Sequence, residues 1–301
     1  MKVKFIDLGR LNSYYEKEIL KSIKKVIQSG QYILGEEVNK FENKFAEYIN
    51  TKYAIGVNSG TDALFLSLKA LNIGKGDEVI TVPNSFISTV SSIVTAGAKP
   101  VLVDVCEDLN INVDLIEEKI TNKTKAIIPV HLTGKPAEMD RIMKIAKEHN
   151  LYIIEDAAQA IGAIYKNKKV GSFGITGCFS LHPLKNLSVC GDGGIIVSSD
   201  RNIIQKIKIL RNIGLKYRDH VEMWGYNSRL DTLQAAIGLI KLKYIENIIK
   251  RKREIAKIYN ENLKEICDVP LELPYERQVY QNYIIKVEER DRLMKFLFKK
   301  I

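Results

Sequence analysis

The stretch YAIGVNSGTDALFLSLKAL, residues 53–71, contains a short apolar run, a tight turn and an apolar helical segment in direct succession. Residues 53–57 are almost all small or apolar, which favours a strand that is buried on both faces. Residues 58–61 (Asn-Ser-Gly-Thr) are turn formers, and the residues from Ala63 to Leu71 predict a helix that begins beside this turn. A buried strand that leads through a glycine turn into a helix is typical of an α/β fold.

Six further apolar runs of similar length follow along the chain, and helical segments separate most of them. They are DEVITV (77–82), KPVLVDV (99–105), KAIIPV (125–130), LYIIE (151–155), GCFSL (177–181) and GGIIVS (193–198). Strands that alternate with helices indicate a parallel sheet. We therefore expect a large α/β domain with a mostly parallel, seven-stranded sheet between helices. Amphipathic helices are predicted over residues 16–29, ending at Gly30, and over residues 201–213.

The last third of the chain has a different pattern. Residues 228–263 predict a long helical stretch with one or two breaks, VYQNYIIKV (279–287) predicts a strand, and residues 290–301 predict a helix. We assign residues 1–235 to the large domain, which includes an N-terminal helical segment, and residues 236–301 to the long helix and the start of a smaller α/β domain. One strand and one helix cannot bury both faces of a layer, so we expect this smaller domain to be incomplete.

Composition narrows the class of protein. The chain has 301 residues, is 46% hydrophobic and carries a net charge of +10. Its lysines lie along amphipathic helical stretches without a nucleic-acid-binding signature, so we expect no nucleic-acid partner. No run is long and apolar enough for a membrane span, and the N-terminus lacks the pattern of a signal peptide, which favours a cytoplasmic protein. Four dispersed cysteines, without metal-ligand spacing, are interpreted as buried or idle thiols: Cys106, Cys178, Cys190 and Cys267.

Lys185 stands out because of its surroundings in FSLHPLKNLSVCGDGG, residues 179–194. We expect it to lie in an apolar strand, followed by glycines 191, 193 and 194 that let the backbone turn closely. Burial lowers the pKa of a lysine amine, and the neutral amine attacks a carbonyl to form a Schiff base. For this residue taken alone, a surface lysine at the end of a strand is the alternative.

The turn at residues 58–61 has the features of a phosphate-binding site. It begins a helix, where backbone N–H groups and the positive end of the helix dipole face outward, and Ser59 and Thr61 add hydroxyl groups. An ordinary helix N-cap is an equally good interpretation of these residue types.

Two further stretches carry polar or aromatic groups to the carboxyl ends of strands, where ligands bind in open α/β sheets. Asp156 and Gln159 follow the strand LYIIE, and a carboxylate at this position suits a cationic ring nitrogen. Phe86 follows DEVITV, where it would stack on a flat cofactor. The alternatives are that Asp156 caps the next helix and that Phe86 closes a core.

A phosphate site, a stacking aromatic ring, an acid for a pyridine nitrogen and a lysine for an aldehyde are the contacts that pyridoxal phosphate requires. The motifs that carry them are VNSGTDAL (57–64), EDAAQAIGA (155–163), CFSLHPLKNL (178–187), GDGG (191–194) and GYNSRLDTLQAA (225–236). Together they resemble the DegT/StrS-type aminotransferases, a family of pyridoxal-phosphate enzymes with the fold of aspartate aminotransferase (fold type I). The resemblance extends from FIDLGR (5–10) to the end of the chain.

The resemblance implies roles for particular residues. Lys185 would hold the cofactor covalently and move the catalytic proton, Asp156 would keep the ring nitrogen protonated, and Gln159 would contact the phenolic oxygen of the ring. Phe86 would stack on the ring. The phosphate would be bound by Ser59, Gly60, Thr61 and Ser180, and by Asn227 of a partner subunit.

The resemblance also implies a homodimer with shared active sites. Its substrates would be glutamate or glutamine as amino donor and a nucleotide-linked keto-deoxysugar as acceptor, in surface-polysaccharide or amino-sugar biosynthesis. The motifs KNL and GDGG favour amination at C-3 of the sugar, with C-4 as the alternative position. His182 and Arg229 are candidate substrate residues, with a packed histidine and a salt bridge at a helix start as alternatives. Family members usually continue beyond Ile301 with a segment that touches the sugar nucleotide. A non-catalytic regulator that binds the cofactor and a sugar dehydratase of the same fold are the alternative functions.

Overall fold

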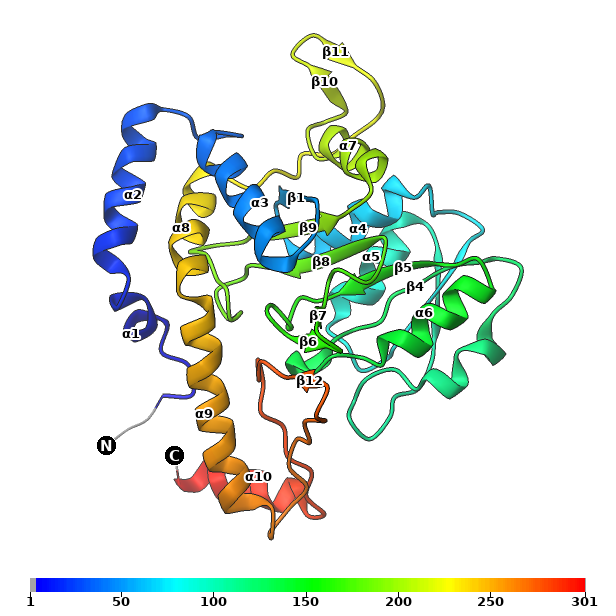
Figure 1. Ribbon diagram of the computed structural model, residues 1–301, viewed down its shortest axis with the longest axis vertical. Helices are drawn as coiled ribbons and strands as arrows, with labels where there is room; N and C mark the ends of the chain where they lie inside the picture. Colours follow the sequence, from blue (N-terminus) through cyan, green and yellow to red (C-terminus); the bar gives the residue numbers. More distant parts are fainter. Residues whose placement is uncertain (1–3, 301) are drawn as a thin grey trace.

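A seven-stranded sheet forms the centre of the protein in a computed structural model that describes residues 4–300 (Figure 1). The strand order is β1-β9-β8-β5-β4-β2-β3, and all neighbouring strands are parallel except the two pairs that involve β9. The seven apolar runs each supply one strand, so the predicted sheet is confirmed. The strands are β1 (Tyr53–Val57), β2 (Glu78–Thr81), β3 (Lys99–Leu102), β4 (Thr124–Ile127), β5 (Tyr152–Asp156), β8 (Thr176–Ser180) and β9 (Gly194–Ser198).

Helices cover both faces of the sheet because the strands are apolar on both sides. In β5, for example, Ile154 packs with the helices on one face and Ile153 with those on the other. The first face carries α4 (Gly60–Ala70), α5 (Ile87–Ala96) and α7 (Arg201–Leu210). The opposite face carries α3 (Glu36–Ile49), α6 (Met139–Glu148) and α8 (Thr232–Lys243).

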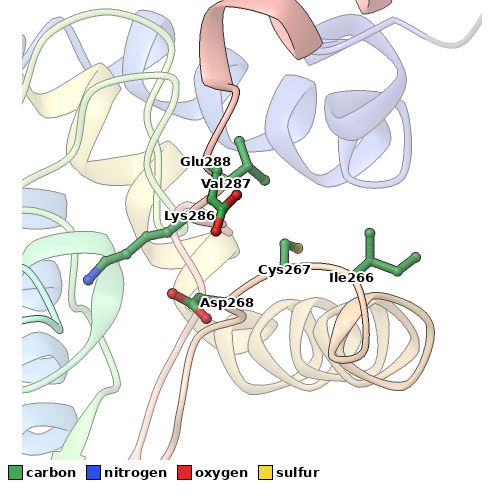
Figure 2. Close-up of a pocket in the computed structure, with 6 residues that line it drawn as sticks. All are labelled: Ile266, Cys267, Asp268, Lys286, Val287 and Glu288. Atoms are coloured by element: carbon green, nitrogen blue, oxygen red, sulfur yellow. The ribbon is translucent and has the colours of Figure 1, made fainter.

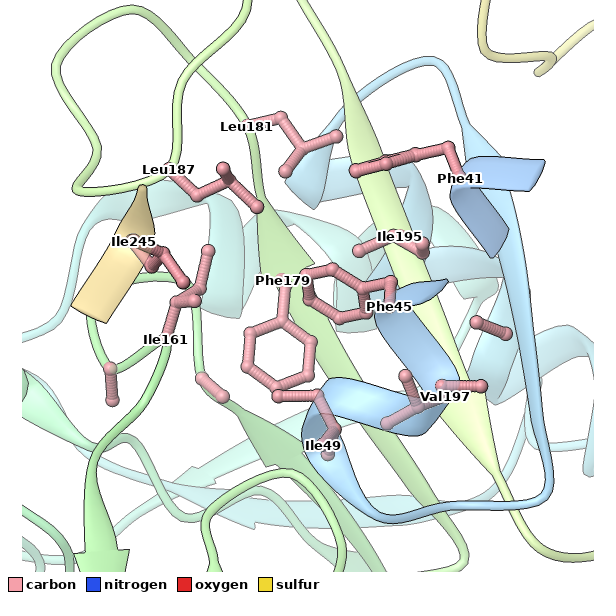
Figure 3. Packing of buried hydrophobic residues seen from close by; sticks show 14 of the residues in the cluster. Phe41, Phe45, Ile49, Ile161, Phe179, Leu181, Leu187, Ile195, Val197 and Ile245 are labelled. Carbon is pink, nitrogen blue, oxygen red and sulfur yellow. The ribbon is translucent and has the colours of Figure 1, made fainter. Parts of the chain in front are cut away.

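Aromatic rings fill the core between α3 and the sheet. Phe45 of α3 and Phe179 of β8 meet edge to face, with ring centroids 5.1 Å apart and ring planes at 75° (Figure 3). Both side chains are fully buried, and together with Phe41 they hold α3 over the strands that lead to the predicted site.

The remaining elements surround this core. A short β10–β11 hairpin projects from the body in Figure 1, and α2 packs along α8. No helix within residues 4–300 combines the length and the apolar character of a membrane span. The bounds are α1 (Leu8–Ser13), α2 (Glu16–Ser29), 3-10 turns at Val113–Leu115, Glu117–Lys119 and Leu132–Gly134, β6 (Ile164–Tyr165), β7 (Lys168–Lys169), β10 (Leu215–Tyr217), β11 (His220–Val221), α9 (Ile245–Leu263), β12 (Glu276–Arg277) and α10 (Arg290–Lys300).

The predicted helices are present, although α7 ends at Leu210 instead of residue 213 and the long helical stretch begins at Thr232 instead of residue 228. Gly30 ends α2 in a left-handed conformation (φ 68°), and a single break at Tyr244 divides the long helical stretch into α8 and α9. The division of the chain between residues 235 and 236 stays a prediction.

The predicted strand over residues 279–287 is wrong. This segment has an irregular backbone in which Tyr280 adopts a positive φ of 45°, and Lys286 forms only an isolated bridge with Asp268. Its backbone and side chains are hydrogen-bonded to Thr133, Gly134, Gln159 and Asn186 instead of to a neighbouring strand. Of this run, Val279 is fully buried and packs in the core cluster that contains Phe45 and Phe179, whereas Ile284 is exposed.

A buried ion pair ties α3 to the region after α7. Glu42 is 7% exposed and Arg211 is 3% exposed, and their side chains are in contact. The Gly56 N–H donates to Glu42 Oε1 (2.8 Å), and Arg211 donates to the Gly56 carbonyl (2.6 Å). The pair thus binds both the N–H and the carbonyl of Gly56, near the end of β1.

Arg211→Ala should destabilise the protein by about 3–5 kcal/mol, because it leaves the Glu42 carboxylate buried without a cation. The free energy of unfolding in urea measures this effect. The double variant Glu42→Leu/Arg211→Met should lose less stability than Arg211→Ala, since neither charge remains buried. Equal losses for the two variants would contradict this explanation.

Candidate active site

The predicted site residues gather where β5 and β8 end and where α4 and α5 begin. Asp156 is the last residue of β5, Ser180 is the last residue of β8, and Gly60 is the first residue of α4. Phe86 immediately precedes α5. The fold therefore brings together residues that lie up to 120 positions apart in the sequence, at the edge where ligands bind in sheets of this type.

Lys185 lies in a turn and not in a strand, which corrects the sequence-based expectation. β8 ends at Ser180, and the Lys185 N–H donates to the His182 carbonyl (2.9 Å). Pro183 and the turn interrupt the strand, because proline cannot donate a ladder hydrogen bond. The side chain of Lys185 is half-buried, and within residues 4–300 no side chain forms a hydrogen bond with its amine. Burial lowers the pKa of this amine, and the Asp156 charge partly opposes the shift.

Asp156 is 6% exposed and has no cation in direct contact within the described residues. Thr89 of α5 donates its hydroxyl to Oδ2 (2.7 Å), and the Ala158 N–H donates to Oδ1 (3.2 Å). Burial raises the pKa of this carboxyl, and the hydrogen bond from Thr89 partly offsets the rise. A buried carboxylate with only two neutral donors favours a bound cation beside it, which fits a protonated ring nitrogen. The Ala158 bond belongs to a local turn, and β6 rather than a helix follows β5, so the alternative that Asp156 caps the next helix does not hold.

The turn before α4 is held tightly against the sheet. A Cβ on Gly60 would lie 2.8 Å from Ser180 Cβ, and a Cβ on Gly194 would lie 2.1 Å from the Ser59 carbonyl oxygen. Only glycine fits at such distances, so the two glycines let the turn approach the end of β8 and the start of β9. Of the three predicted glycines after Lys185, Gly194 makes the closest approach to this turn.

Among the residues predicted to bind the phosphate, Ser59 caps the helix α4, whereas Gly60 and Thr61 offer hydrogen-bond donors. Ser59 accepts a hydrogen bond from the Asp62 N–H (3.0 Å), so it serves as the N-cap of α4. Thr61 donates to Ser88 Oγ (2.8 Å) of α5. The N–H groups of Gly60 and Thr61 have no acceptor within the helix, because they belong to its first turn. This arrangement of N–H and hydroxyl groups suits a phosphate.

Phe86 and Gln159 are the candidates for contacts with the cofactor ring. Phe86 is 70% exposed and therefore does not close a core, which removes the alternative considered for it. It lies one helical turn before Thr89, the partner of Asp156. Gln159 is half-buried, and its Oε1 accepts a hydrogen bond from Asn282 (2.9 Å).

The surroundings of His182 and Arg229 do not support the alternatives considered for them, a packed histidine and a salt bridge at a helix start. His182 is exposed rather than packed: its N–H donates to Ser180 Oγ, and its Nδ1 accepts from the Leu184 N–H (both 3.3 Å). Arg229 donates to Asn212 (3.0 Å) and forms no ion pair within residues 4–300. A salt bridge at a helix start therefore does not explain Arg229.

Asn227 does not cap a helix, because α8 begins at Thr232 and Asp231 precedes it. Asn227 forms an isolated bridge with Asn212, and its side chain is exposed. The adjacent Ser228 is buried and donates to Asp62 Oδ2 (2.6 Å). The two neighbours thus point in opposite directions, with Asn227 toward the outside.

Sequence reasoning missed four polar residues that contact the site: Thr89, Asn186, Gln281 and Asn282. Thr89 follows Phe86 by three positions, so the helical period would have placed it on the same side of α5. Gln281 and Asn282 belong to the segment that was predicted as a strand, and no local pattern marks them.

The cavity drawn in Figure 2 is separate from this site. Its lining residues come from the segments 266–268 and 286–288, and none of the predicted site residues contributes to it. Lys286 points away from the others and pairs with Glu107. Among the cysteines, Cys267 lines this cavity and Cys178 is buried in β8, whereas Cys106 and Cys190 are exposed rather than buried.

Comparisons with known proteins identify the family that this chain resembles. A family model described as the DegT/DnrJ/EryC1/StrS aminotransferase family matches residues 13–300. A dTDP-3-amino-3,6-dideoxy-alpha-D-galactopyranose transaminase from Aneurinibacillus thermoaerophilus is 45% identical over 299 residues, which cover 98% of this chain and 82% of the relative.

Two solved structures have the same fold. The crystal structure of DesV from S. venezuelae, in complex with a ketimine intermediate, has a TM-score of 0.97 and 38% identity, and the match covers 99% of this chain and 81% of that one. NtdA from Bacillus subtilis, with bound cofactor PMP, has a TM-score of 0.90 and 33% identity over 97% of this chain and 68% of that one. Since the family model spans nearly the whole sequence and the relative is 45% identical, this chain belongs to the DegT/DnrJ/EryC1/StrS aminotransferase family.

Proposed function

We propose that this protein is a pyridoxal-phosphate-dependent aminotransferase that transfers an amino group to a nucleotide-linked keto-deoxysugar. The observation that carries the proposal is the presence in one site of Lys185, a half-buried amine with a lowered pKa, and Asp156, a buried carboxylate that no cation contacts within residues 4–300. Beside them, the first turn of α4 offers free N–H groups for a phosphate. NtdA, a relative in fold and sequence, carries the cofactor as PMP, the aminated form of pyridoxal phosphate.

The cofactor would supply an electron-withdrawing ring that stabilises negative charge on the reacting carbon. Asp156 would hold the protonated ring nitrogen, and its burial strengthens this charge interaction because water is excluded. Ser180 and the start of α4, with Gly60 and Thr61, would hold the phosphate. Phe86 would cover one face of the ring, and Gln159 would donate to the phenolic oxygen.

Lys185 would act as the base that moves the proton between the substrate carbon and the cofactor carbon. This role needs an amine that is neutral near pH 7, and burial shifts the pKa of Lys185 in that direction. The turn at residues 182–185 places the amine beyond the end of β8, on a short and hydrogen-bonded connection.

The substrate proposal rests on charge and on similarity. The net charge of +10 favours an anionic substrate such as a nucleotide diphosphate sugar. The relative from Aneurinibacillus thermoaerophilus is named for a dTDP-linked 3-amino sugar, which supports amination at C-3, as do the motifs KNL and GDGG. We include glutamate or glutamine as the amino donor, amino-sugar or surface-polysaccharide biosynthesis as the pathway class, and the cytoplasm as the location.

We further propose a homodimer in which Asn227 reaches the phosphate of the partner's site. Its amide is exposed and forms no hydrogen bond within residues 4–300, while the adjacent Ser228 binds the turn of its own chain. His182 and Arg229 remain candidate contacts for the sugar nucleotide.

A direct test incubates the protein with pyridoxal phosphate, glutamate and a panel of nucleotide keto sugars, and identifies products by mass and NMR. We expect a yellow protein and an amino sugar with nitrogen at C-3. Borohydride should trap the cofactor on Lys185 and leave another buried lysine, Lys241, unmodified. An adduct elsewhere would overturn the site. Bound cofactor without any turnover would favour a regulator, and loss of water without amination would favour a dehydratase.

Asp156→Asn should lower the pKa of Lys185 further in the cofactor-free protein, because the Asp156 charge stabilises the ammonium form. More of the amine is then neutral at pH 7, and we expect Lys185 to react about two- to tenfold faster with trinitrobenzenesulfonate. Peptide mapping across a pH series measures the rate. Asp114→Asn, which removes an exposed carboxylate that does not act on Lys185, is the matched control. An unchanged or slower reaction of the Asp156 variant would contradict the charge coupling.

Mixed dimers test the shared site. Chains with Lys185→Ala and chains with Asn227→Ala should each be inactive alone. After subunit exchange, a heterodimer would have one site with both defects and one intact site, so activity should recover to about a quarter of the wild-type value for random, equal mixing. If Asn227 acts within its own chain, both sites of the heterodimer are defective. Confirmed exchange without recovered turnover would therefore rule out the shared site.

A further inference from the structure

The segment 279–282 is joined to the large domain by its backbone, although it forms no strand. The Val279 N–H donates to the Gly134 carbonyl (3.0 Å), and the Asn282 N–H donates to the Thr133 carbonyl (3.2 Å). The amide of Asn186, the residue after Lys185, donates in turn to the Val279 carbonyl (3.2 Å). A piece of the C-terminal region is thus fixed directly beside the Lys185 turn.

The side chain of Gln281 bonds to both sides of Lys185. Its Nε2 donates to the Leu184 carbonyl (2.7 Å), and its Oε1 accepts from the Asn186 N–H (2.9 Å). These two groups belong to the peptide units that precede and follow the Lys185 Cα. Holding both units restricts φ and ψ of Lys185, and these angles set the direction of its Cα–Cβ bond. If the Gln281 amide were flipped, its NH2 group would face the Asn186 N–H and its oxygen would face the Leu184 carbonyl. Neither pair can form a hydrogen bond, so the orientation of the amide is determined.

The adjacent Asn282 holds a second site residue. Its Nδ2 donates to Gln159 Oε1 (2.9 Å). Asn282 already donates to one lone pair of this oxygen, and the group of the Gln159 amide without a partner among the described residues is Nε2, a donor. A donor is the group that an anionic phenolic oxygen requires.

A strained backbone allows neighbouring residues to reach different targets. Tyr280 has a φ of 45°, a left-handed conformation that is unfavourable for an aromatic residue. It persists because hydrogen bonds fix the chain on both sides, at Val279 and at Asn282. The turn at Tyr280 directs Gln281 to Lys185 and Asn282 to Gln159.

We propose that Gln281 and Asn282 are positioning residues of the aminotransferase site: Gln281 orients Lys185, and Asn282 orients the amide of Gln159. This inference rests on the proposed function for the roles of Lys185 and Gln159. The hydrogen bonds themselves belong to the protein alone, so part of the test needs no cofactor.

Gln234 provides a matched control for Gln281. It makes the same kind of paired bond to the same loop, five residues further on: the Cys190 N–H donates to its Oε1 (2.9 Å), and its Nε2 donates to the Cys190 carbonyl (3.2 Å). It touches neither peptide unit of Lys185. The two variants therefore separate a loss of loop order from a loss of lysine orientation.

Amide hydrogen exchange in the cofactor-free protein is the first measurement. Gln281→Ala should speed exchange at Asn186 by at least about tenfold and leave Cys190 unchanged, whereas Gln234→Ala should do the reverse. Gln281→Glu keeps an acceptor for the Asn186 N–H but sets a second oxygen against the Leu184 carbonyl, so it should restore only part of the protection at Asn186. Unchanged exchange at Asn186 in Gln281→Ala would overturn the role of Gln281.

Kinetics and absorbance of the holoenzyme complete the test. Gln281→Ala should lower kcat about 10- to 100-fold with KM for the keto sugar within about threefold, because orientation of the base is lost and not substrate binding. Gln234→Ala should retain kcat within about threefold. Asn282→Leu should move the pH dependence of cofactor absorbance in the same direction as Gln159→Ala, but by less.

The outcomes separate this inference from the proposed function. If borohydride labels Lys185 in the wild type but Gln281→Ala keeps its kcat, the positioning role of Gln281 is refuted while the proposed function stands. If Gln159→Ala moves the absorbance profile and Asn282→Leu does not, the role of Asn282 is refuted. A wild-type protein without an adduct on Lys185 would refute the proposed function, and with it the positioning roles.

Discussion

The central strand β5 ends in two consecutive buried carboxylates, Glu155 and Asp156, whose side chains point to opposite faces of the sheet. How the protein satisfies each carboxylate determines the structure on that face. Glu155 is fully buried and accepts hydrogen bonds from the N–H groups of Gly171 (2.6 Å), Phe173 (2.6 Å) and Gly174 (2.7 Å) and from His131 Nε2 (3.0 Å). The Ala137 N–H donates to the other ring nitrogen of His131, so Nε2 carries the hydrogen that Glu155 accepts. Neutral donors alone thus satisfy Glu155, and this single side chain ties two loops to β5.

Asp156 points to the other face and has half as many donors, one hydroxyl and one N–H. Burying a charge is costly unless hydrogen bonds or an opposite charge compensate it. Glu155 meets this condition within the protein, whereas Asp156 meets it only in part, and burial raises its pKa. The difference between two adjacent residues of the same chemical type explains why one is structural and why the other suits a bound cation. On the proposed function, the protonated ring of the cofactor completes the environment of Asp156.

The sequence predicted the sheet because each strand is an apolar run buried on both faces, and Phe86, Asp156 and the turn before α4 follow strand ends that the pattern locates. Side chains alternate between the two faces along a strand, which places Glu155 and Asp156 on opposite faces of the sheet. This alternation does not tell which face carries the site, and the family motif supplied that choice. Lys185 was placed in a strand because FSL continues the apolar run, although the proline at 183 ends it. Gln281 could not be found, because its partners lie about 95 residues earlier and the contacts depend on the left-handed turn at Tyr280.

The residues that hold Lys185 are neutral amides, and their neutrality has an electrostatic consequence. A carboxylate in the position of Gln281 would keep an acceptor for the Asn186 N–H but would have no donor for the Leu184 carbonyl, and its charge would stabilise the ammonium form of Lys185 and work against a neutral base. A guanidinium there would lower the pKa of Lys185 but would have no acceptor for Asn186. An amide offers one donor and one acceptor with no net charge, so it orients the lysine without moving its pKa. Asp156 consequently remains the one charged side chain that acts on the Lys185 amine within the described residues. Geometry and charge are thus set by separate groups, which means that the orientation of the base and its protonation can be altered independently.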